Sequence, residues 1–166
     1  MADLAAASPT GRLILRGGPA VAEAAGATLG LTLPQDACRA AGDGERSVLW
    51  LGPDEWLILA PVDPDEDLAA ALETALADRA HALVDVSARQ IGLILTGPDA
   101  ETVLAVGCPL DLDLAAFPVG MCTRTLLSKA EIVLWRTAQT TFRIEVWRSF
   151  GDYVRGILAV GGAVAL

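Results

Sequence analysis

The sequence predicts an α+β fold made of two pseudo-repeated halves, each a ferredoxin-like (split βαβ) arrangement with a mostly antiparallel sheet. Three observations predict it: a weak internal repeat with a period of about 80–86 residues, runs of β-branched and aromatic residues bounded by turn residues, and Gly-Pro helix starts in both halves. We expect one domain over residues 1–166, with pseudo-repeats at about 12–86 and 90–166.

The repeat is carried by matching segments that occur in the same order in both halves. Residues 12–20 match residues 92–100 at an offset of 80, with a one-residue slip at the proline. Val48-Leu49-Trp50 matches Val133-Leu134-Trp135 at an offset of 85. Because apolar strands resemble one another, chance similarity is the alternative, and the common order favours duplication.

Helix starts are marked by proline and by capping residues. Gly18-Pro19 and Gly97-Pro98 place proline at the first helical position, where its missing N–H costs nothing. Asp63–Glu66 and Ser149–Asp152 have the pattern of capping boxes. These signals predict four helices, at about 18–27, 64–79, 98–106 and 149–160.

Strands are expected between these helices, after a first strand that begins near Arg12, and Asp43-Gly44 and Gly52-Pro53 are expected to be hairpin turns. Each half therefore reads β-α-β-β-α-β with an extra hairpin strand. The tail Gly161–Leu166 is expected to close the second half as a strand, and an exposed peptide inserted into a partner is the alternative. The predicted strands are 47–51, 55–60, 82–86, 90–96, 121–127, 132–136 and 141–147.

Composition excludes some functional classes. With 53% hydrophobic and 20% charged residues, the chain is not disordered, and its apolar excess suggests a partner. The net charge of -9 disfavours nucleic-acid binding, because neutralising phosphates requires a basic face. Charge is uneven: residues 1–120 hold 6 basic and 18 acidic residues, whereas residues 121–166 hold 6 and 3.

The cysteines and the termini predict a location. Cys38, Cys108 and Cys122 are odd in number and show no CxxC spacing, so neither a disulfide framework nor a zinc site is expected. The chain begins without a cationic segment ahead of an apolar one, and its longest apolar tail is too short to span a bilayer. We expect a soluble cytoplasmic protein without membrane contact.

No catalytic constellation is evident. His81 is the only histidine and has no neighbouring nucleophile signature. The Gly-Pro helix starts lack the spacing of a phosphate-binding loop, and the acidic run Asp63–Asp67 lacks the spacing of a calcium loop. We therefore predict no catalytic, cofactor-binding or metal-binding residue on this chain.

Two groups of residues remain as candidates. In Asp85-Val86-Ser87-Ala88-Arg89, the arginine is suited to forking onto a carboxylate, although the more ordinary interpretation is that Asp85 and Arg89 bond nearby backbone and fix the junction between the halves. The tryptophans fall on strands, and three of them are expected in the core: Trp50, Trp56 and Trp135. In the strand 141–147 alternation marks a buried side with Phe142, Ile144 and Val146, and turns Trp147 to the polar side with Arg143 and Glu145. An exposed tryptophan beside Arg148 is typical of an interface anchor.

Several segments together resemble the gamma subunit of heterotetrameric sarcosine oxidase, from about Arg12 to Leu158. No single motif is decisive, and the order and spacing of the segments carry the resemblance. The segments are Leu51-Gly52-Pro53-Asp54-Glu55-Trp56-Leu57, Val84–Arg89, Leu95-Thr96-Gly97 with Ala100, Cys108-Pro109-Leu110-Asp111-Leu112, Cys122-Thr123-Arg124-Thr125, and Arg148-Ser149-Phe150 with Tyr153.

The resemblance implies a subunit of an oxidase that converts sarcosine to glycine, releases formaldehyde or passes the one-carbon unit to tetrahydrofolate, and makes hydrogen peroxide. It implies FAD, FMN and NAD on the alpha and beta subunits, zinc on the delta subunit, and no cofactor on the gamma chain, which packs against the larger subunits. The fold is similar to the folate-binding domain of aminomethyltransferases. The residues that we predict to contact a partner are Arg124, Trp147, Arg148 and Tyr153.

The sequence departs from aminomethyltransferases where their folate chemistry is carried out. In the stretch Ser128–Val133 the paired glycines and the aspartate are missing, and Ala88 replaces a histidine. Glu131 is the substitute acid if one exists. A non-catalytic structural subunit that stabilises the catalytic chains, and that self-associates when isolated, is therefore the first hypothesis. An independent folate-binding or one-carbon transfer protein is the second, and a homodimeric ligand-binding module is the third.

Overall fold

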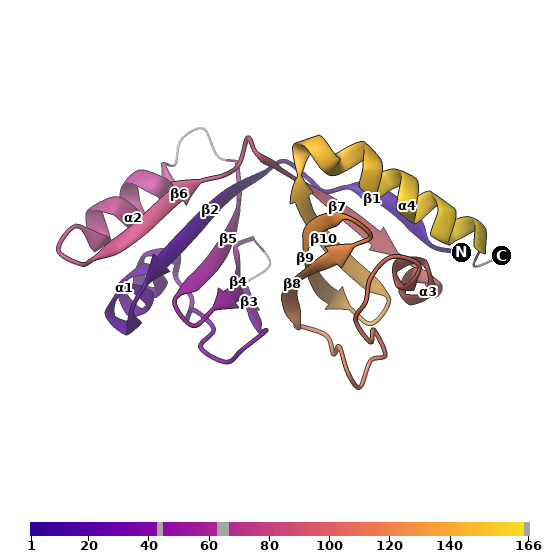
Figure 1. Ribbon diagram of the computed structural model, residues 1–166. Helices are drawn as coiled ribbons and strands as arrows, with labels where there is room; N and C mark the ends of the chain where they lie inside the picture. The colour runs from indigo at the N-terminus through magenta and orange to yellow at the C-terminus, as the bar shows by residue number, and fades with distance from the viewer. Residues whose placement is uncertain (43–44, 63–66, 165–166) are drawn as a thin grey trace. The chain divides into compact units, whose positions relative to one another are not determined.

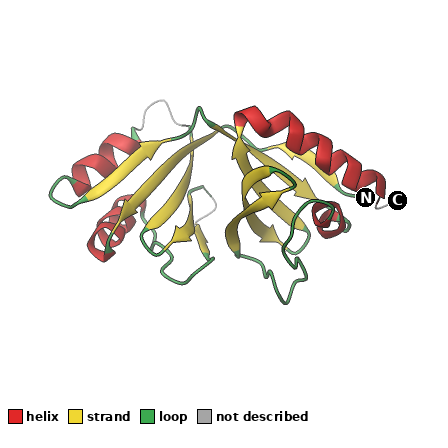
Figure 2. Cartoon of the chain, in the orientation of Figure 1, coloured by secondary structure: helices red, strands yellow, loops and turns green. Residues whose placement is uncertain are grey.

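The computed structural model describes residues 1–42, 45–62 and 67–164. The chain divides into two compact units: unit 1 comprises Met1–Ser8 and Arg89–Leu166, and unit 2 comprises Pro9–Ala88. Each unit is a five-stranded sheet in which all strand pairs are antiparallel, with helices on one face (Figure 2). The predicted turn at Asp43-Gly44 and the predicted capping box at Asp63–Glu66 lie outside the described residues.

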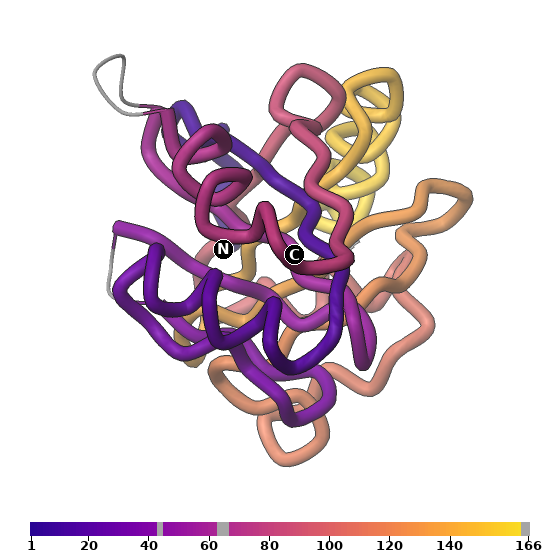
Figure 3. The backbone as a smooth tube through the Cα atoms, turned by 90° about the vertical axis from the view of Figure 1, so that its left-hand side faces the viewer, coloured from indigo at the N-terminus to yellow at the C-terminus, as the bar shows by residue number. Residues whose placement is uncertain are grey.

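Unit 2 follows the predicted order, and the short strand at the edge of its sheet is the predicted extra hairpin strand. The sheet order is β3-β4-β5-β2-β6, and α1 and α2 run side by side, turned toward the viewer in Figure 3. Its elements are β2 (Thr10–Gly17), α1 (Pro19–Leu29), β3 (Ala40–Gly42), β4 (Ser47–Gly52), β5 (Glu55–Pro61), α2 (Leu68–Leu76) and β6 (His81–Asp85).

Local signals explain both helices of unit 2. Pro19 opens α1, as predicted. The helix ends at Gly30, whose φ of 75° lies in the left-handed region that favours glycine. Helix α2 begins at Leu68, after the N-cap residue Asp67, whose carboxylate accepts a hydrogen bond from the Ala70 N–H at 2.9 Å.

The tryptophans differ in their burial. Trp56 is 1% exposed in the core of unit 2, and its indole N–H donates to the Pro34 carbonyl at 2.8 Å, which satisfies its one polar group. Trp50 is half-buried and packs against the core of unit 2, and Trp135 is half-buried, so only Trp56 is fully buried as predicted.

Unit 1 repeats this order with one strand supplied from elsewhere in the chain. Its sheet order is β1-β7-β10-β9-β8, and α3 packs against α4. Its elements are β7 (Gln90–Thr96), α3 (Ala100–Ala105), β8 (Cys122–Leu127), β9 (Ala130–Ala138), β10 (Thr141–Trp147), the 3₁₀ turn η1 (Arg148–Phe150), α4 (Gly151–Val164) and β1 (Asp3–Ala6).

Strand β1 closes the sheet of unit 1. It pairs antiparallel with β7, from Asp3 opposite Thr96 to Ala6 opposite Leu93, and it lies as an indigo strand beside β7 and α4 (Figure 1). In unit 2, β6 pairs with β2 in the equivalent place. The first residues of the chain lie close to Gly97, whose φ is 124° and where an added Cβ would lie 2.4 Å from the Met1 carbonyl oxygen.

The predicted closing strand at Gly161–Leu166 is therefore wrong. Residues 161–164 continue α4, and residues 165–166 lie outside the described residues. The helix persists because Val154, Leu158 and Gly161 recur at helical spacing on its buried side. Gly161 lies so close to α3 that an added Cβ would be 2.5 Å from the Val103 carbonyl oxygen.

The two units have the predicted fold class, two antiparallel α+β halves each with an extra hairpin strand. The four helices and the seven predicted strands are found within a few residues of their predicted positions, and β3 is the extra hairpin strand of the first half, whereas β1 carried no sequence signal of its own. Among the described residues, no helix is long and apolar enough to cross a membrane.

Candidate functional site

Three of the four predicted contact residues lie together, and the fourth does not. Trp147 ends β10, Arg148 begins η1 and Tyr153 lies in the first turn of α4, so a continuous stretch of chain presents them, and all three are exposed. Arg124 is exposed on the edge strand β8. Its register partner is Val133, which places it on the sheet face opposite the core.

Arg89, which was predicted to fix the junction between the halves, lies against one side of this stretch of chain. The guanidinium carbon of Arg89 lies over the Trp147 ring, 4.9 Å from its centroid. The Arg148 N–H donates to the Arg89 carbonyl at 2.8 Å, which holds the two backbone segments together. Trp147 is nevertheless 45% exposed, as its strand alternation predicted.

The other side is formed by two aromatic rings in contact. Phe150 and Tyr153 meet edge to face, with ring centroids 6.2 Å apart and an interplanar angle of 79°. The Tyr153 hydroxyl donates to the Ser128 hydroxyl oxygen at 2.8 Å, across the turn between β8 and β9. We name Arg89, Trp147, Arg148, Phe150 and Tyr153 the aromatic–arginine surface.

This surface has the composition of a protein-binding site. Trp, Tyr and Arg are the residue types that dominate binding energy at protein interfaces. Each aromatic side chain here already has an intramolecular contact that restricts its rotamers, so docking costs less conformational entropy than it would for mobile side chains. The arrangement is suited to recognising another polypeptide.

Strand β10 carries a charged pair, Arg143 and Glu145, on the side that alternation marks as polar. Phe142, Ile144 and Val146 are buried, as predicted. Glu145 lies on the polar side of the strand, yet it is 1% exposed, and its carboxylate accepts a hydrogen bond from Arg143 Nε at 2.8 Å. Pairing with an arginine is what allows a carboxylate to be buried.

The residues Asp85 and Ser87 fix the end of unit 2. The Ser87 N–H donates to the Asp85 carboxylate at 2.8 Å, and the Arg12 N–H donates to the Ser87 hydroxyl oxygen at 2.8 Å. Hydrogen bonds from the Ser87 hydroxyl and from its backbone N–H lower the pKa of Asp85. The backbone-fixing interpretation is therefore confirmed for Asp85, while the guanidinium of Arg89 stacks on Trp147.

His81 lies between two hydrogen-bond acceptors. Its Nδ1 is 2.8 Å from the Arg79 carbonyl oxygen, and its Nε2 is 3.1 Å from the Glu73 carboxylate. The hydrogen bond to the Arg79 carbonyl, followed by the one to Glu73, raises the pKa of His81. Only the doubly protonated imidazolium can donate to both acceptors, so the ring holds α2 to the start of β6.

This arrangement predicts a pH dependence in unit 2. Because the pKa is raised on folding, protonated His81 stabilises unit 2 fully below its unfolded pKa of about 6.5, and this contribution is lost as the pH rises through the higher folded-state pKa. His81 is the only histidine, so one imidazole resonance in an NMR titration reports it. We expect a midpoint above 6.5 that falls in Glu73→Gln, and an unchanged midpoint in that variant would contradict the assignment.

Neither His81 nor Glu131, the two candidate acid–base residues, lines the depression described for unit 2. An open depression of 580 Å³ runs along α1 and the segment 30–35, and its lining includes neither His81 nor Glu131. Glu131 is exposed near the start of β9. In residues 1–42, 45–62 and 67–164, no group of three or more His, Cys, Asp or Glu side chains is arranged to hold a metal ion.

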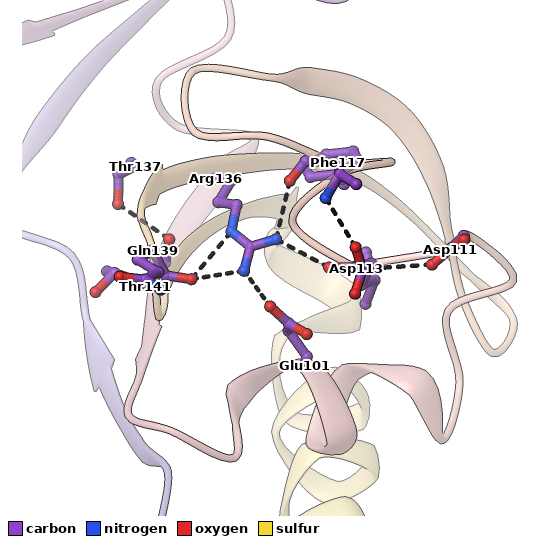
Figure 4. A network of polar contacts seen from close by, with 10 residues as sticks. Glu101, Asp111, Asp113, Phe117, Arg136, Thr137, Gln139 and Thr141 are labelled. Carbon is purple, nitrogen blue, oxygen red and sulfur yellow. Dashed lines mark hydrogen bonds and ion pairs between the residues drawn. The ribbon is translucent and has the colours of Figure 1, made fainter.

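Sequence reasoning missed a buried arginine that organises unit 1 (Figure 4). Arg136 is 0% exposed, and all five of its N–H donors have acceptors. Nη1 donates to the carbonyls of Leu112 and Phe117, both at 2.9 Å. Nε and Nη2 donate to the Gln139 carbonyl at 3.1 and 2.6 Å, and Nη2 also pairs with the Glu101 carboxylate.

The position of Arg136 could be read from the sequence by alternation. Ile132, Leu134 and Arg136 share one face of β9, and the first two are in the core. An arginine at a core-facing position must find acceptors for its donors, because a buried unpaired guanidinium is prohibitively costly. Its role is to tie α3, the segment before β8 and the β9–β10 turn to one another.

The chain has the duplicated α+β fold of the aminomethyltransferase type: a crystal structure of glycine cleavage system aminomethyltransferase T from Bartonella henselae matches 95% of this chain and 45% of that chain, with a TM-score of 0.67 and 16% identity. At that identity the likeness shows the fold alone.

The sequence shows which family the chain belongs to. The family described as "Sarcosine oxidase, gamma subunit family" matches residues 16–163, and the chain belongs to this family. A sarcosine oxidase subunit gamma from Corynebacterium sp. (strain P-1) is 40% identical over 126 residues, which are 75% of this chain and 61% of that protein. The chain thus spans about three fifths of the length of this curated relative.

A solved structure of the same family matches nearly the whole chain. A chain of the heterotetrameric sarcosine oxidase from Corynebacterium sp. U-96, in complex with pyrrole 2-carboxylate, has a TM-score of 0.91 and 33% identity, and the match covers 99% of this chain and 86% of that chain. The resemblance inferred from the sequence motifs is thereby confirmed.

Proposed function

We propose that this chain is the non-catalytic structural gamma subunit of a heterotetrameric sarcosine oxidase and that it stabilises the catalytic subunits by binding them. The observation that carries the proposal is the match over 99% of the chain to a protein that is part of a heterotetramer. The exposed and restrained aromatic–arginine surface supplies the chain's own means of binding.

The reaction of the complex is the oxidative demethylation of sarcosine. Sarcosine loses two electrons and two protons to a flavin, water adds to the resulting imine, and glycine and formaldehyde separate, or the one-carbon unit passes to tetrahydrofolate. Dioxygen reoxidises the flavin and takes up the two electrons and two protons as hydrogen peroxide. We place FAD, FMN, NAD and zinc on the alpha, beta and delta partner subunits, within the cytoplasm, and none of them on this chain.

In this proposal, the chain's own residues maintain the shape of its two units. Arg136 and β1 hold unit 1 in shape, and the Asp85–Ser87 bonds hold the end of unit 2. The folate-binding alternative is not favoured, because the likeness to the aminomethyltransferase shows the fold alone and the sequence lacks the glycines and the aspartate in the stretch Ser128–Val133.

Co-expression with and without this chain tests the proposal. The alpha, beta and delta subunits of a sarcosine oxidase from the same genome are produced together, and the assembled oxidase is quantified by size-exclusion chromatography and by sarcosine-dependent hydrogen peroxide formation. We expect omission of this chain to reduce recovery of the assembled oxidase at least tenfold, because the docking contacts are lost. Equal recovery and equal turnover without it would contradict the proposal.

A further inference from the structure

We infer that the outer edge of β6 in unit 2 binds an extended segment of a partner subunit as an additional strand, and that this segment alternates basic with apolar side chains. This inference rests on the proposed function and deepens it by naming a further binding site and the chemistry of the segment that fills it. It is carried by three features of β6: its outward backbone groups, its lack of protective residues, and the different chemistry of its two faces.

Strand β6 is the last strand of its sheet. In the part of the chain that the structure describes, it pairs with β2 alone, in a continuous register without a bulge (Figure 1). Just beyond it, the Val86 N–H donates to the Arg12 carbonyl at 2.9 Å. Because backbone groups alternate between the two sides of an antiparallel strand, the N–H and C=O groups of His81, Leu83 and Asp85 point away from β2. These groups can form hydrogen bonds with a further strand.

Strand β6 lacks the features by which exposed strand edges avoid pairing. Such edges are protected by shortness, by charged side chains, by proline or by a bulge. The other edge strands have such features: β1 and β3 comprise only four and three residues, and β8 carries Arg124 in its interior. β6 has five residues, contains no proline, lysine or arginine, and has ionisable residues only at its two ends. An edge of this kind is a template for pairing with another chain.

The two faces of β6 differ in chemistry. Leu83 packs against the core of unit 2, so Ala82 and Val84 lie on the opposite face, where both are exposed, Val84 by 52%. Asp85 is exposed on the same face as Leu83, toward α2. The Glu73 carboxylate of α2 reaches the first residue of β6, and its side chain is 54% exposed. An added strand would place alternate side chains beside a small apolar surface and beside two carboxylates.

The charge around this edge is acidic. Residues 9–88, which form unit 2, hold 13 acidic and 5 basic residues. Two exposed arginines of unit 2 adjoin β6, and both have acceptors: Arg16 on β2 is paired with Asp54, and Arg79, in the turn before β6, donates to the Ala75 carbonyl. The acidic excess favours a basic partner segment, because complementary potentials steer association and like charges repel each other.

A second copy of this chain fits the edge less well than a basic segment does. Two β6 strands paired edge to edge would bring two units of strong acidic excess together, and like charges oppose such pairing. A segment with lysine or arginine at every second position places its cations toward Glu73 and Asp85. Its intervening apolar side chains then cover Val84 on the other face.

Hydrogen exchange at single-residue resolution tests the added strand. The full chain is compared alone and within the oxidase that assembles on co-expression with the alpha, beta and delta subunits. We expect the outward N–H groups of Leu83 and Asp85 to exchange at least tenfold more slowly in the assembly than in the chain alone. The N–H groups of Ala82 and Val84, which alternation directs toward β2, are the internal control and are expected to be protected in both states.

Variants test the apolar face of β6 through the recovery of assembled oxidase in co-expression. Val84→Lys places a cation where the basic segment is expected to dock, and we expect it to lower recovery at least fivefold. Val106→Lys is the matched control, because it makes the same change at a valine that is 45% exposed at the end of α3 in unit 1. The control is expected to change recovery less than twofold.

A double variant tests the acidic face. Glu73→Gln/Asp85→Asn removes two negative charges and keeps oxygen acceptors at both positions, so we expect recovery to fall at least threefold and to depend less on salt. Glu23→Gln/Asp36→Asn, which makes the same change at exposed residues elsewhere in unit 2, is expected to behave like the wild type. Circular dichroism of each variant confirms folding.

The outcomes distinguish this inference from the proposed function. An assembly that contains the chain but leaves Leu83 and Asp85 exchanging as in the chain alone would overturn the docking edge and leave the subunit role standing. Protection of Leu83 with normal recovery of the carboxylate double variant would overturn the basic segment. Protection that rises with the concentration of the isolated chain would make a second copy the occupant and overturn the partner segment. If the chain is absent from the assembled oxidase, both ideas fail.

Discussion

Replacing Arg136 with alanine is expected to destabilise unit 1 by about 3–5 kcal/mol, the loss typical of breaking a buried charged network by removing one partner. The variant leaves the carbonyls of Leu112, Phe117 and Gln139 without their donor (Figure 4). Each buried acceptor that loses its partner costs about 1–3 kcal/mol. The guanidinium also lies over the Phe142 ring, 4.8 Å from its centroid, so packing is lost as well.

Hydrogen exchange measured by mass spectrometry resolves this effect unit by unit. Peptides from β9, β10 and α3 are expected to lose protection, while those from unit 2 keep it. The matched control is Arg16→Ala, which breaks an ion pair with Asp54 whose side chains are 55% and 53% exposed. Such an exposed pair contributes no more than about 1 kcal/mol. Equal losses in Arg136→Ala and Arg16→Ala would contradict the role of the buried arginine.

Deleting residues 2–8 is expected to destabilise unit 1 by about 3 kcal/mol while leaving unit 2 protected, because β7 loses a ladder of hydrogen bonds and the core loses Leu4. The partly buried Leu4 and Ala2 pack against the core of unit 1 although they precede unit 2 in sequence. Chemical denaturation followed by hydrogen exchange in β7 and α4 measures the loss.

Two proline variants provide a sharper version of this test. The Ala7 N–H donates to the Gly92 carbonyl at 2.9 Å, so antiparallel alternation turns the Ala5 N–H toward β7 and the Ala6 N–H away from it. Ala5→Pro removes a ladder donor and is expected to destabilise unit 1, whereas Ala6→Pro removes an outward N–H and is expected to be much milder. Equal effects of the two prolines would contradict the pairing of β1 with β7.

The sequence predicts the elements of both units because their patterns are local. Alternation in β10 identified the buried residues Phe142, Ile144 and Val146 and the exposed Trp147. Pro19 marked the start of α1 at its residue. Where local pattern and tertiary packing agree, the sequence is sufficient.

The missed elements depend on contacts distant in sequence. Asp3–Ala6 is short and consists mostly of residues that are depleted in strands, so its pairing with a strand nearly 90 positions away leaves no local signal. The tail was assigned to a strand because, in the repeat, it corresponds to the closing strand of the first half. In the structure β1 takes that place, and Val154 and Leu158 of α4 pack in the core of unit 1.

The candidate site was partly visible in the sequence. Alternation found Trp147, and Arg148 and Tyr153 were predicted with it; the structure places all three on one stretch of chain. The stacking of Arg89 on Trp147 brings together residues 58 positions apart, and no periodic pattern connects them. Arg124 was grouped with them by sequence and lies on a separate strand.

The turnover rate per flavin of the fully assembled oxidase tests most directly whether this protein contributes binding surfaces and no reacting group. Assembled complexes containing wild-type chain or His81→Ala/Glu131→Ala are matched for composition by native mass spectrometry and compared for kcat with sarcosine. The account predicts equal kcat in both. A loss of a hundredfold or more in a complex that has assembled normally would show that a group on this chain takes part in the chemistry and would contradict it.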